Sequence, residues 1–207
     1  MLADNEVQPL NWTRGGFNYP NLVRIGTIGD GSCFFHAIVK AFYTPYKLGV
    51  LNGVPIDKRA FIKNLRKDCA VKLVQKVNPS NKLSPRYYDV LSRGRLNDFA
   101  KSVPAFTLEN MQKVLNSNLP IDNSFNEFIS NLLNKDIYLL DFSTKDVYIT
   151  GKDDDILYKG RDSIIILVMP GHYELIGLIT NNGIQTLFPA DSALIRAINQ
   201  QRLRKMR

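Results

Sequence analysis

The chain of 207 residues has little cysteine, little histidine and no long apolar segment. Two cysteines, Cys33 and Cys69, are too few for a disulfide framework, so we expect a reducing compartment and a cytoplasmic protein. No run of about 18 apolar residues occurs, and we therefore expect no membrane span. Residues 1–6 have neither the basic nor the apolar region of a secretory signal, so we expect no export.

The composition is that of an ordinary globular protein, with 44% hydrophobic and 22% charged residues. The length predicts one domain over residues 1–207, with an irregular lead-in at 1–21 and a basic C-terminal helix within 189–207. The net charge of +8 is concentrated at 58–76 and 196–207, which we interpret as solvated helix faces. No zinc-finger or RNA-recognition motif accompanies this basic charge, so we expect no binding to nucleic acid. We also expect a monomer.

The pattern of apolar residues places helices first and strands later. Helical spacing and N-cap and proline signals predict helices at 33–43, from Asp57 to before Pro79, and within 85–101, 107–117 and 122–134. Residues 44–55 contain two prolines and two glycines and are interpreted as a loop.

Strands are expected at 22–28, 137–142, 147–150, 163–169, 172–180 and 184–188, with a hairpin turn at Asn182-Gly183. The run at 163–169 is continuously apolar and β-branched, which predicts a central strand buried on both faces. Asp191 is expected to begin the final basic helix. The order predicts an α+β fold in which an antiparallel meander is joined by the early strand.

One cysteine stands where a thiol can become a nucleophile. Cys33 follows the turn Asp30-Gly31-Ser32 and begins an apolar helix. The orphan N–H groups and dipole of a helix N-terminus favour negative charge, and therefore a thiolate. The backbone N–H groups of Asp30, Gly31, Ser32 and Cys33 could converge near the sulfur as an oxyanion hole. This pattern predicts a cysteine hydrolase if a base reaches the thiol.

Only His36 and His172 could supply that base. His36 lies in the same helix as Cys33 and is interpreted as a packing or surface residue. His172 opens a strand, and Glu174 lies on the same face because alternate strand residues share a face. A carboxylate there can orient the imidazole, which gives the nucleophile, base and orienter of a triad. Asp30 is the alternative orienter.

The segment at 29–38 (GDGSCFFHAI) and the later Gly171-His172-Tyr173-Glu174 resemble the two motifs of the ovarian-tumour (OTU) family of cysteine proteases. The resemblance covers roughly residues 22–180, in order and spacing. It implies a papain-like fold, with helices flanking a small, mainly antiparallel sheet. It also implies a thiol isopeptidase that removes ubiquitin or a ubiquitin-like modifier, from single conjugates or polyubiquitin chains. Such a compact domain would suit a virus or a bacterium acting in a host cytosol.

By position in the motifs, Cys33 would be the nucleophile, His172 the base and Asp30 the aspartate that shapes the oxyanion turn. Gly171 and Tyr173 would line the substrate cleft. The chain departs from the family at Glu174, where Asp or Asn is usual, and the longer side chain changes the reach to the imidazole.

Other interpretations remain beside this one. Cys69 lies on the apolar face of its helix and is expected to be core. The cysteines and histidines have no standard metal-site spacing, so we expect neither a metal nor another cofactor. The acidic run 153–155 is a solvated loop or a contact for the arginines of a ubiquitin tail. The alternative function is a catalytically silent module of the same fold that binds ubiquitin, an acidic partner or nucleic acid.

Overall fold

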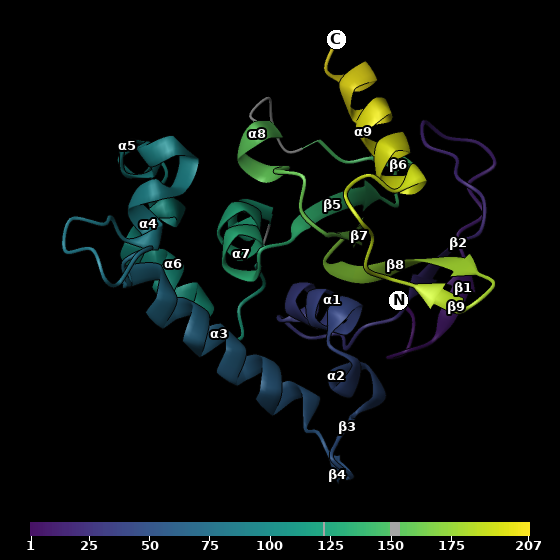
Figure 1. Ribbon diagram of the computed structural model, residues 1–207, viewed down its shortest axis with the longest axis horizontal. Helices are drawn as coiled ribbons and strands as arrows, with labels where there is room; N and C mark the ends of the chain where they lie inside the picture. The colour runs from purple at the N-terminus through teal and green to yellow at the C-terminus, as the bar shows by residue number, and fades with distance from the viewer. Residues whose placement is uncertain (122, 150–153) are drawn as a thin grey trace.

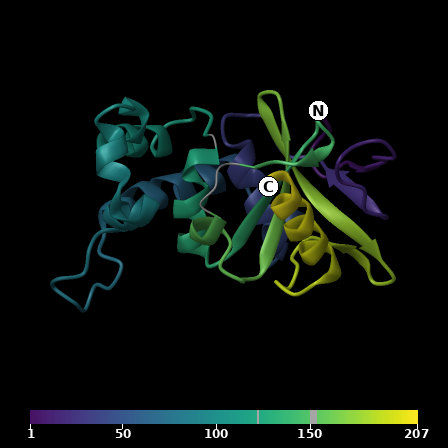
Figure 2. The same ribbon diagram turned by 90° about the horizontal axis from the view of Figure 1, so that it is seen from above.

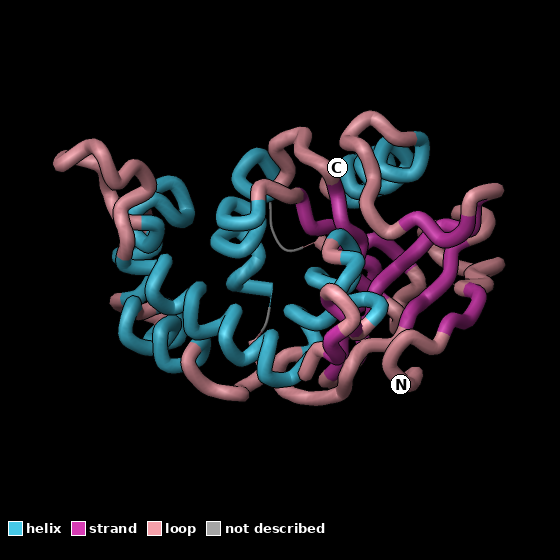
Figure 3. The backbone as a smooth tube through the Cα atoms, turned by 60° about the horizontal axis from the view of Figure 1, so that its bottom comes forward, coloured by secondary structure: helices cyan, strands magenta, loops and turns pink. Residues whose placement is uncertain are grey.

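The computed structural model describes residues 1–121, 123–149 and 154–207 (Figure 1). The prediction for the acidic run 153–155 falls on side chains outside this description. A strand-rich half and a helical half lie next to each other, as the views in Figures 2 and 3 show. Within the described residues, no helix is both long and apolar enough to cross a membrane.

The main sheet has the order β1-β2-β8-β7-β5-β6, and β9 also pairs with β8. The predicted early strand does join the sheet, because β2 pairs antiparallel with β8. The strands are β1 (Val7–Pro9), β2 (Leu22–Ile25), β5 (Asp136–Asp141), β6 (Asp146–Val147), β7 (Ser163–Met169), β8 (His172–Thr180) and β9 (Gly183–Gln185).

The prediction of a simple antiparallel meander is wrong at one pair. β5 and β7 run parallel, with Asp136 opposite Ser163. A parallel pair needs a crossover, which here includes α8 (Asp154–Leu157). The buried Asp136 carboxylate holds the end of that crossover: it accepts the backbone N–H groups of Lys159, Gly160 and Arg161 and pairs with the Arg161 Nε at 2.6 Å.

The predicted burial of the central strand on both faces is confirmed, because alternate residues of β7 enter two different cores. Ile164 and Ile166 belong to the cluster that includes α1 (Cys33–Phe42). Ile165 and Leu167 belong to the cluster that includes α9 (Ala193–Lys205). The sheet is therefore sandwiched between helices, with α1 packed against β8 and β7.

The helical half follows α1 in the sequence. α3 begins after Asp57, whose side chain accepts the Ala60 N–H as predicted for an N-cap. The helix expected within 85–101 is broken, because Ser92 and Arg93 have left-handed backbone angles. The elements are α3 (Lys58–Val74), α4 (Tyr87–Val90), the 3-10 helix η1 (Leu91–Gly94), α5 (Leu96–Ala100), η2 (Pro104–Phe106), α6 (Leu108–Leu115), η3 (Asn123–Phe125) and α7 (Asn126–Leu133).

Two segments expected to be irregular contain structure. The predicted loop 44–55 forms α2 (Thr44–Leu48) and a hairpin of β3 (Val50–Leu51) and β4 (Val54–Pro55). Pro45 lies in the first turn of α2 and Gly49 is its left-handed C-cap, whereas Gly53 lies in the hairpin turn and Pro55 ends β4. The lead-in 1–21 contributes the strand β1 to the sheet. It also contributes the buried side chains of Leu10, Trp12 and Phe17 to the hydrophobic cluster that includes α9.

Candidate functional site

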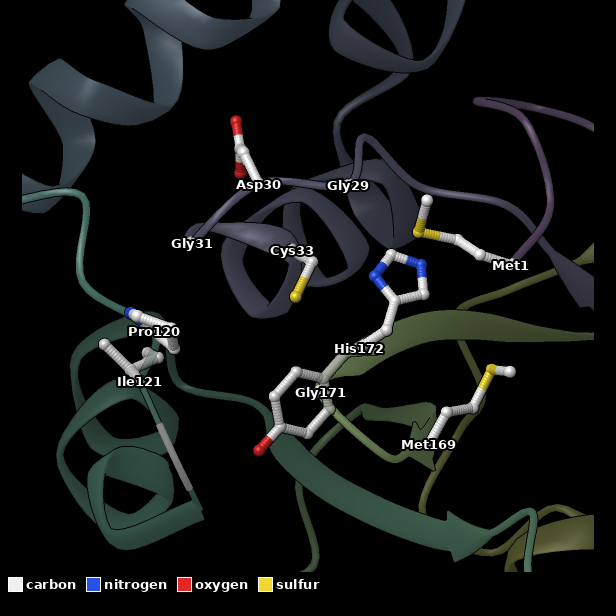
Figure 4. A pocket seen from close by; sticks show the side chains of 11 residues that line it. Met1, Gly29, Asp30, Gly31, Cys33, Pro120, Ile121, Met169, Gly171 and His172 are labelled. Carbon is white, nitrogen blue, oxygen red and sulfur yellow. The ribbon is translucent and has the colours of Figure 1, made fainter.

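An open cleft of about 580 Å³ lies where the turn before α1 meets the start of β8 (Figure 4). It holds both residues that the sequence predicts as nucleophile and base. The lining residues are Met1, Gly29, Asp30, Gly31, Cys33, Pro120, Ile121, Met169, Gly171, His172 and Tyr173. Residues far apart in the sequence, Cys33 and His172, therefore share one cavity.

Cys33 is the first residue of α1, and its side chain is directed into the cleft. Burial raises the pKa of its thiol above 9.0, although backbone N–H groups of Tyr173 and Phe34 near the sulfur act in the opposite direction. The expected effect of the helix N-terminus is thus outweighed by desolvation. At neutral pH the free protein holds a neutral thiol that needs a base.

His172 is the first residue of β8, and its imidazole extends into the same cleft as the Cys33 side chain (Figure 4). Burial lowers its pKa below 6.5, while the Glu174 carboxylate acts to raise it. The imidazole is therefore neutral near pH 7 and able to accept a proton. Its Nε2 is buried and has no hydrogen-bond partner among the described residues.

Glu174 lies on the His172 face of β8, as the strand spacing predicts, but its carboxylate is held mainly by other groups. Glu174 Oε1 lies 3.9 Å from His172 Nε2, which is beyond hydrogen-bond distance. Arg24 on β2 donates to Glu174 from Nε at 2.7 Å and from Nη2 at 3.0 Å, and the Leu2 N–H donates to Oε1 at 2.9 Å. Whether this fully buried carboxylate orients the imidazole stays a prediction.

Sequence reasoning missed Arg24. Its signal lay in the register of the early strand, because β2 pairs with β8 and Arg24 stands opposite Ile176, two residues from Glu174. Diagonal neighbours on one sheet face are within reach of long side chains.

Asp30, the alternative orienter, points away from His172 (Figure 4). Its Oδ1 accepts the Ser32 N–H at 2.8 Å, and its Oδ2 lies 3.2 Å from His36 Nε2 and 3.6 Å from Arg59 Nε. The carboxylate therefore braces the turn before the nucleophile, and it makes no described contact with the predicted base.

His36 is fully buried, so the surface reading is wrong, and it has two polar partners. Its Nδ1 is hydrogen-bonded to the Tyr46 hydroxyl and its Nε2 to the Asp30 carboxylate. Burial lowers its pKa, so the ring is neutral, with Nε2–H donating to Asp30 and Nδ1 accepting from Tyr46. The second histidine supports the turn rather than the thiol.

The four backbone N–H groups of the turn do not all face a substrate. Asp30 N–H donates to the Ile28 carbonyl, Ser32 N–H to the Asp30 side chain, and Cys33 N–H to the Asp30 carbonyl at 3.2 Å. Within the described part of the chain, Gly31 N–H has no acceptor, and Gly31 lines the cleft. Of the four N–H groups expected in an oxyanion hole, only Gly31 N–H is therefore left without an acceptor among the described residues.

The remaining predicted residues occupy the positions that the motifs suggest. Gly171 lines the cleft with a φ of 70°, a left-handed angle that favours glycine. Tyr173 also lines the cleft, but its ring packs edge-on against the ring of Phe34, with 5.3 Å between the ring centroids. Cys69 is buried in the core of the helical half, where desolvation raises its pKa to about 12.

The sequence matches no protein-family model, and no curated protein matches it. Solved structures do match. An OTU domain in complex with ubiquitin aligns with a TM-score of 0.53 and 17% identity, over 88% of this chain and 83% of that one. An OTU deubiquitinase from Wolbachia pipientis wMel has a TM-score of 0.38 and 14% identity, over 92% and 99% of the chains. The OTU domain protease of Farallon virus has a TM-score of 0.37 and 16% identity, over 86% of this chain and 99% of that one.

The fold and the cleft together define a class. The architecture is α+β and papain-like, with a cysteine at a helix N-terminus and a histidine at the start of a neighbouring strand. More narrowly, the chain has the fold of OTU domains.

Proposed function

We propose that this protein is an OTU-family cysteine deubiquitinase, a thiol isopeptidase that removes ubiquitin or a ubiquitin-like modifier from lysine side chains. The observation that carries the proposal is that Cys33 and His172 line one cleft. The similarity in fold to an OTU domain solved with ubiquitin supports the choice of substrate. Two free thiols suit a cytosolic location for the reaction.

The pKa directions define the resting state of this reaction. Burial keeps the thiol protonated and the imidazole neutral, so His172 acts as general base when substrate binds. The Cys33 thiol proton moves to His172 as the sulfur bonds to the isopeptide carbonyl carbon. The carbonyl oxygen becomes an oxyanion, and Gly31 N–H can donate to it.

Collapse of this intermediate releases the lysine amine, which takes the proton from His172, and leaves ubiquitin as a thioester on Cys33. Water then gives a proton to His172 and attacks the thioester carbon, which frees the ubiquitin carboxylate and restores the thiol. A ubiquitin tail ends in two glycines and is narrow. Gly29, Gly31 and Gly171 on the cleft walls leave room for such a tail.

The test uses ubiquitin carrying a C-terminal electrophile. Wild-type protein and Cys69→Ala should form a one-to-one covalent adduct, and Cys33→Ala should form none. The matched variant is informative because both cysteines are buried and free. Cleavage of a panel of di-ubiquitins and modifier conjugates then assigns the substrate. If the wild type binds ubiquitin yet neither forms the adduct nor cleaves any conjugate, the silent-module alternative replaces this proposal.

A further inference from the structure

Arg66 on α3 is an unusual buried charge. Arg66 is 1% exposed, and no carboxylate among the described residues forms an ion pair with it. Instead it donates to five oxygens: from Nη1 to Gly31 O at 3.0 Å and Ser32 Oγ at 2.8 Å, from Nη2 to Val114 O at 2.6 Å and Leu119 O at 2.8 Å, and from Nε to Leu115 O at 3.3 Å. All five N–H groups of the guanidinium are thereby used.

These acceptors join two separate segments. Two of them belong to the turn before Cys33, and three belong to residues 114–119, which are the end of α6 and the loop that follows it. Ser32 Oγ also reaches Asn118 Oδ1 at 3.1 Å. Arg66 therefore ties the turn that precedes the nucleophile to a second loop by direct bonds.

The turn needs such a tie because it contains a glycine that cannot be replaced. A Cβ on Gly31 would lie 1.8 Å from the Asn118 carbonyl oxygen, so the close approach of the two segments requires glycine. Glycine has more backbone freedom than any other residue and loses more on ordering. The N–H available to an oxyanion is thus on the most mobile kind of residue.

The turn lies between two hollows. The catalytic cleft lies on one side of it, and a second hollow of about 480 Å³ lies on the other, with Asp30 lining both. The second hollow is lined by Ser32, Arg66 and residues 116–118 among others. Between the two hollows, the backbone of the turn is fixed by its hydrogen bonds to Arg66 and Asp30 and by the close approach of Gly31 to the Asn118 carbonyl.

The bonds fix both peptide planes that flank Gly31. The Asp30–Gly31 plane is held through the Asp30 carbonyl, which accepts the Cys33 N–H. The Gly31–Ser32 plane is held at both ends, because the Gly31 carbonyl accepts from Arg66 and the Ser32 N–H donates to the Asp30 side chain. Fixed planes on both sides set the direction of the Gly31 N–H.

We propose that Arg66 is a positioning residue that preorganises the oxyanion turn. This inference deepens the proposed function and depends on its acyl-transfer chemistry. An arginine is required because only a guanidinium offers five donors in a fixed fork, whereas a lysine offers three from one point. Arg66 donates no described hydrogen bond to Cys33 or His172, but its charge interacts with the Cys33 thiol through space. Arg66→Lys keeps that charge, so this variant changes the hydrogen bonds of the turn while a cation remains near the thiol.

The test compares two reactions of the same sulfur. Hydrolysis of a ubiquitin C-terminal coumarin amide passes through an oxyanion, whereas alkylation by ubiquitin bearing a C-terminal bromoethyl amide displaces bromide and develops no oxyanion. Removing one oxyanion donor typically costs about 100- to 1000-fold in kcat. Loosening the donor through Arg66→Lys should therefore lower kcat at least about tenfold, with KM and the alkylation rate within about twofold of wild type.

Lys63→Ala is the matched control, because Lys63 lies on the same helix and lines the same hollow. It should leave both reactions unchanged. Ser32→Ala removes one Arg66 acceptor and should give a smaller loss of hydrolysis alone, which keeps the idea testable if Arg66→Lys unfolds. Equal losses in hydrolysis and alkylation, or no loss in either variant, would overturn the inference.

The two proposals fail in different ways. If wild-type protein reacts with neither ubiquitin reagent, the proposed function falls. Arg66 is then tested with small reagents, N-acetylglycinal for thiohemiacetal formation at Cys33 and iodoacetamide for alkylation, both followed by mass spectrometry. Arg66→Lys should weaken the first at least about tenfold and spare the second, and a parallel change would refute the positioning role.

Discussion

The ion pair between Arg24 and Glu174 has two separable consequences, one for stability and one for catalysis. The Glu174 side chain is 0% exposed and that of Arg24 is 12% exposed, and two hydrogen bonds join them. Breaking a buried pair by removing one partner costs about 3–5 kcal/mol, because an uncompensated charge remains. Since Arg24 reaches some solvent, we expect Glu174→Gln to cost about 3 kcal/mol, the lower end of that range.

The reverse substitution should cost at least as much. Arg24→Gln leaves the fully buried carboxylate with the Leu2 N–H and the more distant His172. The double variant leaves neither charge, so its loss should be smaller than the sum of the single losses by about 2 kcal/mol. Urea unfolding of the four proteins measures this coupling. A coupling near zero would mean that the pair does not stabilise the fold.

Catalysis distinguishes the two partners. If Glu174 orients His172 across 3.9 Å, Glu174→Gln should lower kcat/KM about tenfold, which corresponds to about 1.4 kcal/mol of transition-state stabilisation. Ubiquitin binding should be nearly unchanged. The assay is hydrolysis of the coumarin substrate at a temperature where each variant is fully folded. Wild-type kcat/KM in folded Glu174→Gln would refute the orienting role and leave Glu174 as a structural partner of Arg24.

Two further predictions follow from other groups. Burial lowers the pKa of His172 below 6.5 and raises that of Cys33 above 9.0, so kcat/KM should be constant between pH 6.5 and 9.0. It should fall at lower pH because the imidazole is protonated, and at higher pH because the thiol loses the proton that the leaving amine needs. A decrease in kcat/KM that begins above pH 6.5 on acidification would contradict this prediction. Asp136→Asn removes the charge that holds Arg161 and should cost about 3–5 kcal/mol in urea unfolding, with kcat/KM of the folded variant unchanged; an unaffected stability would show that the crossover is held by other contacts.

The elements with strong local signals were predictable from the sequence. The predicted strands 163–169 and 172–180 agree with β7 and β8, because a continuous β-branched run and the Pro170-Gly171 turn delimit them. The break at Ser92 and Arg93 was not predictable, since left-handed angles at non-glycine residues have no local pattern. Nor was the parallel pairing of β5 with β7, which depends on tertiary packing rather than on either strand.

The site shows the same division. The turn before Cys33 and the strand at His172 carry short motifs, so both residues could be named from the sequence. The electrostatics could not, because burial decides them: the helix N-terminus suggests an ionised thiol, and desolvation keeps it neutral. Arg66 lies in the basic stretch 58–76, which the sequence predicts to be a solvated helix face, and no sequence pattern singles out Arg24. Only the folded neighbours of a cation reveal whether it faces solvent.

The pairing of β2 with β8 also has a consequence for how the protein folds. The contact between Arg24 and Glu174 joins residues 150 positions apart, and closing a flexible loop of that length costs about 4 kcal/mol of entropy. Local contacts within the helical half carry no such cost, so helices can form well before this sheet closes. We therefore expect the nucleophile to meet its base only at a late step of folding, after the helices have formed.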